Sequence, residues 1–295
     1  WVYLLESLIE CSKDKRLEVK NGAIQTFFRI IDSHSNYLPS WKLIYSVVLK
    51  PLLTIKHLDG NFAEYIDFYD IAISGLVTLY PIHFSNFDSE DAQINTDAWI
   101  TFYGTLQKLF GSQSSGVKFV AITNYKRLLQ SLLELSNVPD EILNKSHQLW
   151  INYNIVYSDS PEQKNANSKS EYDCVYELIS TFPFVYQLAT KYDKLSFEFV
   201  ENSLSLFNAA SRYPLLPPYS KDSVKASTLQ ASVLNGLKEF DNEQSNEVEF
   251  LILFQLSAMA TLMFDTREKI MTKLAPKLSK ANLSRVPTFE AISYR

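Results

Sequence analysis

The side chains that most often carry out chemistry do not form a catalytic or metal-binding pattern in this sequence. The four histidines are dispersed along the chain: His34, His57, His83 and His147. None of them has a second ligand at a spacing that would place both on one face of a helix, and H-E-x-x-H and C-x-x-C are absent. Nucleophile elbows and Gly-rich phosphate loops are also absent. The sequence therefore predicts no catalytic residue, no metal ligand and no cofactor.

Acidic residues and cysteines give no stronger signal. Carboxylate pairs such as Asp67/Asp70 and Asp88/Asp91 fall on polar faces or in loops, and we interpret them as solvated. The two cysteines, Cys11 and Cys174, are far apart and each lies in an apolar helical context. We expect two buried thiols in a reducing compartment, where disulfides are rare.

The composition favours long helices over a sheet. Only 7 of the 295 residues are Gly and 11 are Pro, whereas hydrophobic residues make up 46%. A sandwich or barrel needs a turn roughly every 8–12 residues, and glycine usually supplies many of these turns. The low glycine content is therefore typical of long helices joined by short corners.

The charge argues against a nucleic-acid partner. The formal net charge is −5 at pH 7, whereas nucleic-acid-binding domains carry a clustered basic excess that supplies most of the affinity. Positive charge gathers only near the end, where residues 265–295 contain seven Lys/Arg and three Asp/Glu. The sequence predicts a mainly acidic body that ends in a basic tail.

Apolar residues recur at helical spacing almost throughout the chain. The first two stripes lie in residues 4–9 and 19–31, on either side of a polar corner. Further helices are expected at about 41–54, 61–80, 96–110, 117–135, 139–157, 171–182, 183–192, 195–212, 219–241, 247–264 and 267–279. Pro51 predicts a kink or an early end of the first of these helices, and Pro81 predicts the end of the second.

The chain divides into three segments. Residues 1–157 are predicted to form N-terminal helical repeats, and residues 171–295 C-terminal repeats with the basic tail. Between them, residues 158–170 contain no large apolar side chain and predict a flexible loop. We expect one continuous stack of repeats and, because Trp1 already lies in an apolar pattern, a fragment of a larger protein. The apolar stretch 250–264 is too short to span a membrane and is interpreted as a fully buried core helix.

The first helix pair has the pattern of a HEAT repeat. Asp14 is followed five residues later by Val19 and then by Lys20. The aspartate can cap the second helix, and the lysine can pair with the neighbouring repeat's aspartate, so the motif can repeat along a stack. About a dozen antiparallel helices are explained better by such a stack than by a closed bundle. The predicted fold is all-α: an α-solenoid of HEAT/armadillo-type antiparallel helix pairs.

Two stretches of this region carry a more specific resemblance. The segments "DKRLEVKNGAIQTFFRIIDSH" and "LPSWKLIYSVVLKPLL" resemble the C-terminal half of the large Arf guanine-nucleotide exchange factors. Within that superfamily they are most similar to the relatives that lack the catalytic Sec7 module, the monensin-sensitivity (Mon) family of the Golgi and endosomes. The specific match covers about forty residues, and a weaker one follows between Arg212 and Gln230.

The resemblance implies a function and a place in the cell. It implies a cytoplasmic protein, peripheral on trans-Golgi and endosomal membranes, that acts as a scaffold in membrane recycling. The implied partners are a Dopey-family protein, a phospholipid flippase or an Arf-like GTPase. No Sec7-like stretch with its catalytic glutamate occurs in the sequence, so the resemblance implies no exchange activity.

Two surfaces are candidates for partner binding. The first is the proline-stiffened corner that contains Tyr213, Leu215, Leu216 and Tyr219, and the alternative is a corner packed on the neighbouring repeat. The second is the helical face formed by Lys273, Lys277 and Lys280, which suits an acidic partner or an anionic membrane, or else is simply solvated.

The sequence therefore predicts a non-enzymatic scaffold that binds partner proteins through a helical-repeat surface. One alternative is a HEAT-repeat adaptor of another pathway, such as nuclear transport, which a repeating concave acidic groove would favour. The other alternative is an all-α enzyme, which a deep polar pocket with converging titratable groups would favour.

Overall fold

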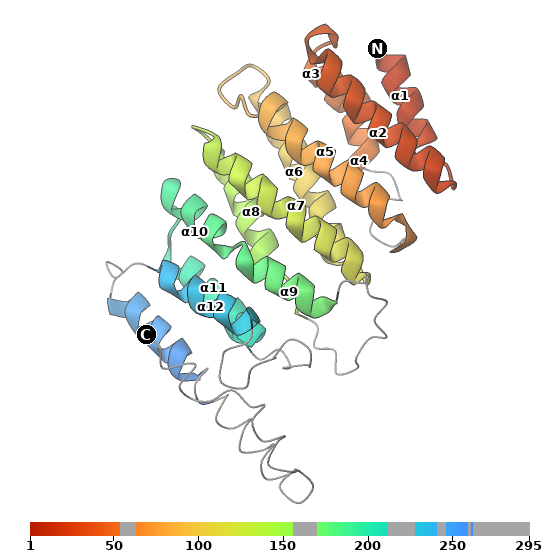
Figure 1. Cartoon of the computed structure of the whole chain (residues 1–295). Coiled ribbons are helices and arrows are strands. Elements are labelled where there is room, and N and C mark those ends of the chain that lie inside the picture. The colour runs from red at the N-terminus through yellow and green to blue at the C-terminus, as the bar shows by residue number, and fades with distance from the viewer. Residues whose placement is uncertain (54–62, 156–169, 212–227, 241–245, 259–260, 262–295) are drawn as a thin grey trace, which may run out of the picture. The chain divides into compact units, whose positions relative to one another are not determined.

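The computed structural model describes residues 1–53, 63–155, 170–211, 228–240, 246–258 and 261 (Figure 1). All regular secondary structure among these residues is helical, so the predicted all-α class is confirmed. The chain separates into two compact units. The first consists mainly of Trp1–Asn154, with Gln187–Lys191, and the second contains Glu171–Tyr186 and the described residues from 192 onward. Each unit is described separately below.

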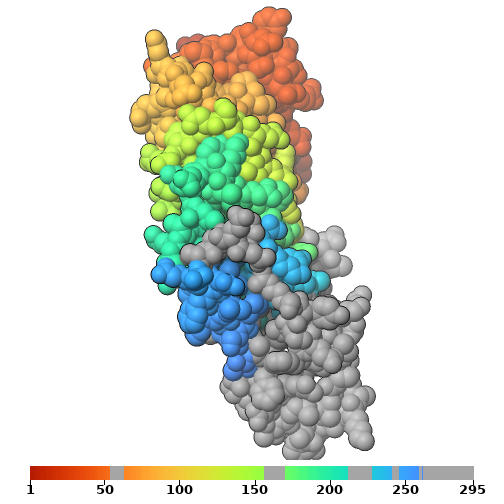
Figure 2. All heavy atoms as spheres, turned by 90° about the vertical axis from the view of Figure 1, so that its left-hand side faces the viewer, coloured from red at the N-terminus to blue at the C-terminus, as the bar shows by residue number. Residues whose placement is uncertain are grey.

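Among the described residues of 1–154, the first unit contains eight α-helices. They are α1 (Val2–Cys11), α2 (Leu17–His34), α3 (Trp41–Ile44), α4 (Lys50–Leu53), α5 (Ile66–His83), α6 (Ala92–Phe110), α7 (Ser115–Glu134) and α8 (Asp140–Ile151). Two 3-10 turns, η1 (Ser35–Tyr37) and η4 (Ala63–Tyr65), and a π-helical turn, η2 (Tyr45–Leu49), accompany them. In the space-filling view, the atoms of these helices form a continuous surface on the face shown (Figure 2).

The helices of the first unit pack as pairs in two layers. In one layer, α2 contacts α5 and α5 contacts α7; in the other, α4 contacts α6 and α6 contacts α8 (Figure 1). The layers are joined by contacts of α1 with α2 and of α6 with α7. Each helix therefore buries its apolar stripe against a pair partner and against the next helix of its own layer.

Aromatic side chains fill the space between the layers. Trp99 of α6 is completely buried, and its ring meets the ring of Tyr80 edge-on at 5.5 Å between centroids. Its Nε1 donates a hydrogen bond to the carbonyl oxygen of Phe84 at 3.0 Å. Phe102 lies one turn further along α6, with its ring 4.8 Å from that of Tyr80. This cluster joins α5 to α6 and forms the centre of the unit.

Phe28 of α2 packs against Gly75 of α5. A Cβ atom added at Gly75 would lie 2.5 Å from Cδ2 of the Phe28 ring, so only glycine lets the ring lie against the α5 backbone. Phe27, the neighbouring residue, is completely buried as expected, whereas Phe28 is half-buried. The two rings meet edge-on at 5.1 Å between centroids.

Pro51 does not end its helix. The helical path continues from α3 through η2 into α4, and the turn before Pro51 is π-helical, with the Lys50 N–H bonded to the carbonyl oxygen of Tyr45. A proline has no N–H to donate, and its ring collides with the carbonyl four residues earlier in a regular α-helix. The wider π turn is a known response to such a conflict.

Two predicted helix ends are wrong. Pro81 lies inside α5, which continues to His83; a proline in the last turn removes only one internal hydrogen bond. By contrast, α8 ends at Ile151 rather than near residue 157. The residue after it, Asn152, competes for backbone hydrogen bonds and commonly ends helices. The predicted opening of α8 is confirmed, because Asp140 and Glu141 lie in its first turn.

The second unit has a core of its own. Its helices are α9 (Glu171–Ser180), α10 (Phe182–Lys191), of which residues 187–191 group with the first unit, α11 (Phe197–Ser211), α12 (Thr228–Glu239) and a helical stretch at 246–258. The ring of Phe182 lies 4.8 Å from Phe207 and 5.5 Å from Phe240, measured between centroids. Helix α12 contacts both α9 and α11.

Two burial predictions need correction. Cys174 is buried as expected, but Cys11 is exposed on α1, because it lies on the outer side of a helix that buries Leu5 and Ile9. In residues 246–258, Phe250, Leu253 and Phe254 are between 58% and 66% exposed. The described part of the stretch 250–264 is therefore not a fully buried core helix.

Candidate functional site

Lys20 of α2 is a buried cation. Its side chain has no exposed surface, and its Nζ donates a hydrogen bond to the carbonyl oxygen of Ser12 at 2.7 Å. The same Nζ lies 4.8 Å from the ring centre of Tyr65 and 4.7 Å from that of Phe68. Burial lowers the pKa of Lys20, because removal from water disfavours the charged form. The lysine thus links the first helix pair to η4 and α5 through the two aromatic faces.

Asp14 does not cap α2. Its Oδ1 accepts hydrogen bonds from the backbone N–H and Nε of Arg16, at 2.8 and 3.0 Å, while Arg16 occupies the N-cap position without a side-chain cap. The hydrogen bonds from Arg16 lower the pKa of Asp14. The expected cap is therefore wrong, because Asp14 lies two residues too early. Val19 is half-buried on α2, and a role of these residues in stacking repeats stays a prediction.

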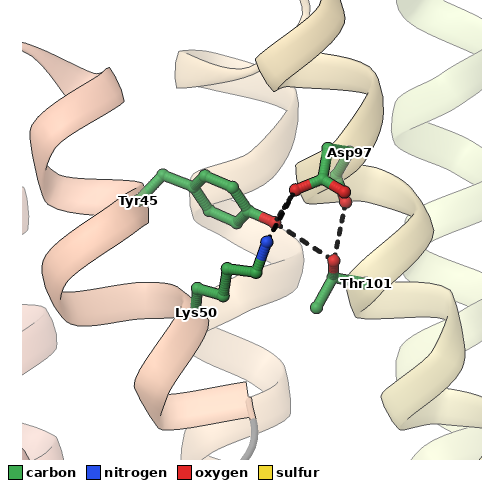
Figure 3. Close-up of polar contacts among 4 residues, drawn as sticks. All are labelled: Tyr45, Lys50, Asp97 and Thr101. Atoms are coloured by element: carbon green, nitrogen blue, oxygen red, sulfur yellow. Dashed lines mark hydrogen bonds and ion pairs between the residues drawn. The ribbon is translucent and has the colours of Figure 1, made fainter.

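A polar cluster of four residues, Tyr45, Lys50, Asp97 and Thr101, joins η2 and α4 to α6 (Figure 3). The Tyr45 hydroxyl donates to Oδ2 of Asp97 at 2.7 Å and lies 3.1 Å from Oγ1 of Thr101. Lys50 Nζ forms an ion pair with the same Asp97 oxygen at 3.2 Å. No sequence motif predicts this cluster, because Tyr45 and Lys50 lie about fifty residues before Asp97 and Thr101.

The pKa shifts in the polar cluster favour a role in stabilising the contact between helices over a catalytic role. Burial raises the pKa of Tyr45 to about 12, and its hydrogen bond to Asp97 acts in the same direction. The Tyr45 hydroxyl and, secondarily, Lys50 lower the pKa of Asp97. A tyrosine this weak as an acid and a carboxylate held in its ionised form transfer no proton readily near neutral pH.

Removing the Tyr45 hydroxyl tests whether the polar cluster stabilises the fold. Tyr45→Phe is expected to lower the free energy of unfolding by about 0.5–1.5 kcal/mol, the usual net value of one hydrogen bond. Lys50→Ala is the matched control, and it should cost only about 0–1 kcal/mol because the ion pair is exposed. Urea unfolding measures both variants. An effect of Lys50→Ala larger than that of Tyr45→Phe would contradict the interpretation.

The other predicted site residues lie outside the described part of the chain. They are Tyr213, Leu215, Leu216, Tyr219, Lys273, Lys277 and Lys280, and the same holds for His57 and for residues 158–169. Among the described residues, no group of three His, Cys, Asp or Glu side chains is placed to hold a metal ion. None of the described helices combines the length and the apolar character needed to cross a membrane.

The described residues thus define an all-helical protein of paired helices, tied together by aromatic packing and by the polar cluster. The chain is 48% identical over 294 residues to protein MON2 of Saccharomyces cerevisiae (strain ATCC 204508 / S288c). The match covers 100% of this chain and 18% of the yeast protein. The resemblance to the Mon family is confirmed over the whole chain. No family model matches the sequence, and no solved structure matches it.

Proposed function

We propose that this chain is a non-catalytic scaffold segment in Golgi–endosome membrane traffic, and that it binds partner proteins through a helical-repeat surface. The observation that supports this most strongly is the 48% identity to protein MON2 along the whole chain. The chain spans less than a fifth of the yeast protein's length, so the proposed scaffold role is that of one segment and not of the whole yeast protein. The family resemblance implies a cytoplasmic location, peripheral on trans-Golgi and endosomal membranes.

The arrangement of the first unit supports a solenoid as the architecture of this scaffold. Its helices contact their neighbours in series, α2–α5–α7 in one layer and α4–α6–α8 in the other. In a solenoid, each repeat buries its apolar face on the next one and leaves an extended surface for partners. We therefore propose HEAT/armadillo-type repeats, with a Dopey-family protein, a phospholipid flippase or an Arf-like GTPase as partners.

A segment exchange in yeast tests the proposed function. In one strain the homologous segment of MON2 is deleted, and in another it is replaced by this chain; return of an endosomal cargo to the Golgi is followed by fluorescence microscopy. The deletion should slow the return, and the replacement should restore it. The matched control is the replacement that carries Trp99→Ala, which removes the centre of the first unit. Normal return in the deletion strain would overturn the proposal.

A further inference from the structure

A pocket of about 400 Å³ lies between α6 and α8 in the first unit. Pockets that bind ligands commonly have volumes of about 300–1,000 Å³. Apolar side chains such as Ile100, Phe110 and Leu149 form part of the lining. No residue of the polar cluster is among the described residues that line it. The pocket is therefore a separate feature of the surface.

Two matched rows of residues line the pocket. Helix α6 and the position just after it contribute Gly104, Gln107 and Gly111, and α8 and the position just after it contribute Lys145, Gln148 and Asn152. Both rows have the spacing i, i+3, i+7, which places their members on one face of a helix. Each row extends over about 10 Å, at 1.5 Å per residue. That length corresponds to about three residues of extended chain.

Gly104 leaves this groove open. A Cβ atom added at Gly104 would meet nothing within 4 Å, in contrast to Gly75, where the Phe28 ring occupies the space. Glycine inside a helix costs about 1 kcal/mol relative to alanine. At Gly104 no described side chain occupies the space next to the backbone. We therefore interpret the glycine as keeping the groove open.

The side-chain amides that line the pocket are exposed. Among the described residues, no hydrogen bond is made by the side-chain amides of Gln107, Gln148, Asn152 and Asn154. Tyr103, which also lines the pocket, is buried, and its hydroxyl lies beside the Ser146 side chain and is not exposed to the pocket. The four exposed amides are therefore the groups that can form hydrogen bonds with a further molecule in the groove.

The residues that line the pocket indicate what kind of molecule it binds. A side-chain amide both donates and accepts hydrogen bonds, as does each peptide unit of an extended chain. Among the described lining residues, Lys145 is the one cation and none is acidic. A single cation in a chain of net charge −5 does not suit a nucleic acid or a membrane surface, but it suits one carboxylate.

We propose that the α6–α8 pocket binds an extended peptide segment of a partner protein, with an acidic side chain of the segment paired to Lys145. The segment's backbone lies along the two rows, where Gln107, Gln148 and Asn152 pair with its N–H and C=O groups. This mode of recognition uses main-chain hydrogen bonds for affinity and a side-chain contact for specificity. The proposal rests on the scaffold function and names one of its contact sites.

Selection from random heptapeptides displayed on phage tests the proposal with the 295-residue chain as bait. Peptides enriched by the wild type should share an acidic residue. Their synthetic forms, measured by fluorescence anisotropy, should bind Gly104→Phe at least tenfold more weakly, because the added ring fills the groove. The matched control is Gly22→Phe, since a Cβ atom at Gly22 also meets nothing within 4 Å but Gly22 lies on α2. Circular dichroism and thermal melting verify that each variant is folded.

Lys145 supplies the second arm of the test. Lys145→Glu should bind the acidic peptides at least tenfold more weakly. In the phage selection it should instead enrich peptides that carry a basic residue in place of the acidic one. Enriched peptides without acidic preference, or equal binding to folded Gly104→Phe and Gly22→Phe, would overturn the proposal. Failure to enrich any peptide overturns it as well. These binding results are independent of the segment exchange in yeast, so failure of the pocket leaves the proposed traffic function standing, and the converse also holds.

Discussion

Trp99→Ala is expected to lower the free energy of unfolding by about 3–5 kcal/mol, the usual cost of removing a buried Trp or Phe side chain. The whole side chain is buried, and the substitution leaves a cavity next to Tyr80 and Phe102. It also leaves the Phe84 carbonyl without the donor that Trp99 Nε1 provides. Equilibrium unfolding in urea, followed by circular dichroism, measures the loss.

A second variant separates packing from hydrogen bonding at this position. Trp99→Phe keeps an aromatic ring but removes the Nε1 donor, and leaving a buried acceptor unsatisfied costs about 1–3 kcal/mol. We expect Trp99→Phe to lie between the wild type and Trp99→Ala. If Trp99→Ala unfolds at the same urea concentration as the wild type, the α5–α6 cluster is not the centre of the first unit.

His147 should make the first unit sensitive to acid. Burial lowers the pKa of His147 to about 4, whereas an unfolded histidine titrates near about 6.5. Between these values the unfolded chain binds a proton that the folded chain does not, so stability falls as the pH falls. Over the whole window the loss amounts to about 3 kcal/mol, at 1.36 kcal/mol per pKa unit.

The measurement compares the wild type with His147→Gln by urea unfolding at several pH values from 7 to 4. Other groups also titrate in this range, so the informative quantity is the difference between the two proteins. The wild type should lose stability relative to His147→Gln progressively below about pH 6.5. Parallel curves for the two proteins would show that His147 is protonated equally in the folded and unfolded states.

Local patterns in the sequence were sufficient to predict the helices. Apolar spacing located most of the described helices to within a few residues, and the expected start near residue 139 agrees with the start of α8 at Asp140. The two wrong helix ends have local causes, because Pro81 falls in the last turn of α5 and Asn152 follows the last residue of α8. Periodicity alone also could not show that Cys11 lies on the outer side of α1.

The candidate sites could not be predicted from the sequence. The polar cluster pairs Tyr45 with Asp97, and the α6–α8 pocket depends on Gly104 lying next to the helix of Lys145. Both require knowledge of which helices are neighbours, and no motif encodes it. Lys20 was recognised as important, but no motif predicts its described partners, which are the Ser12 carbonyl oxygen and the rings of Tyr65 and Phe68.

The π turn at η2 also explains an unusual periodicity in this part of the sequence. The buried residues come in pairs that repeat every four positions: Ile44 and Tyr45, Val48 and Leu49, Leu52 and Leu53. In an α-helix of 3.6 residues per turn, each step of four residues rotates the pair by about 40°, so the third pair would be turned by about 80° from the first. A wider turn cancels this rotation, because it uses more residues per revolution. The four-residue repeat, together with Pro51, is thus the sequence signature of an underwound helix that keeps one side facing α6.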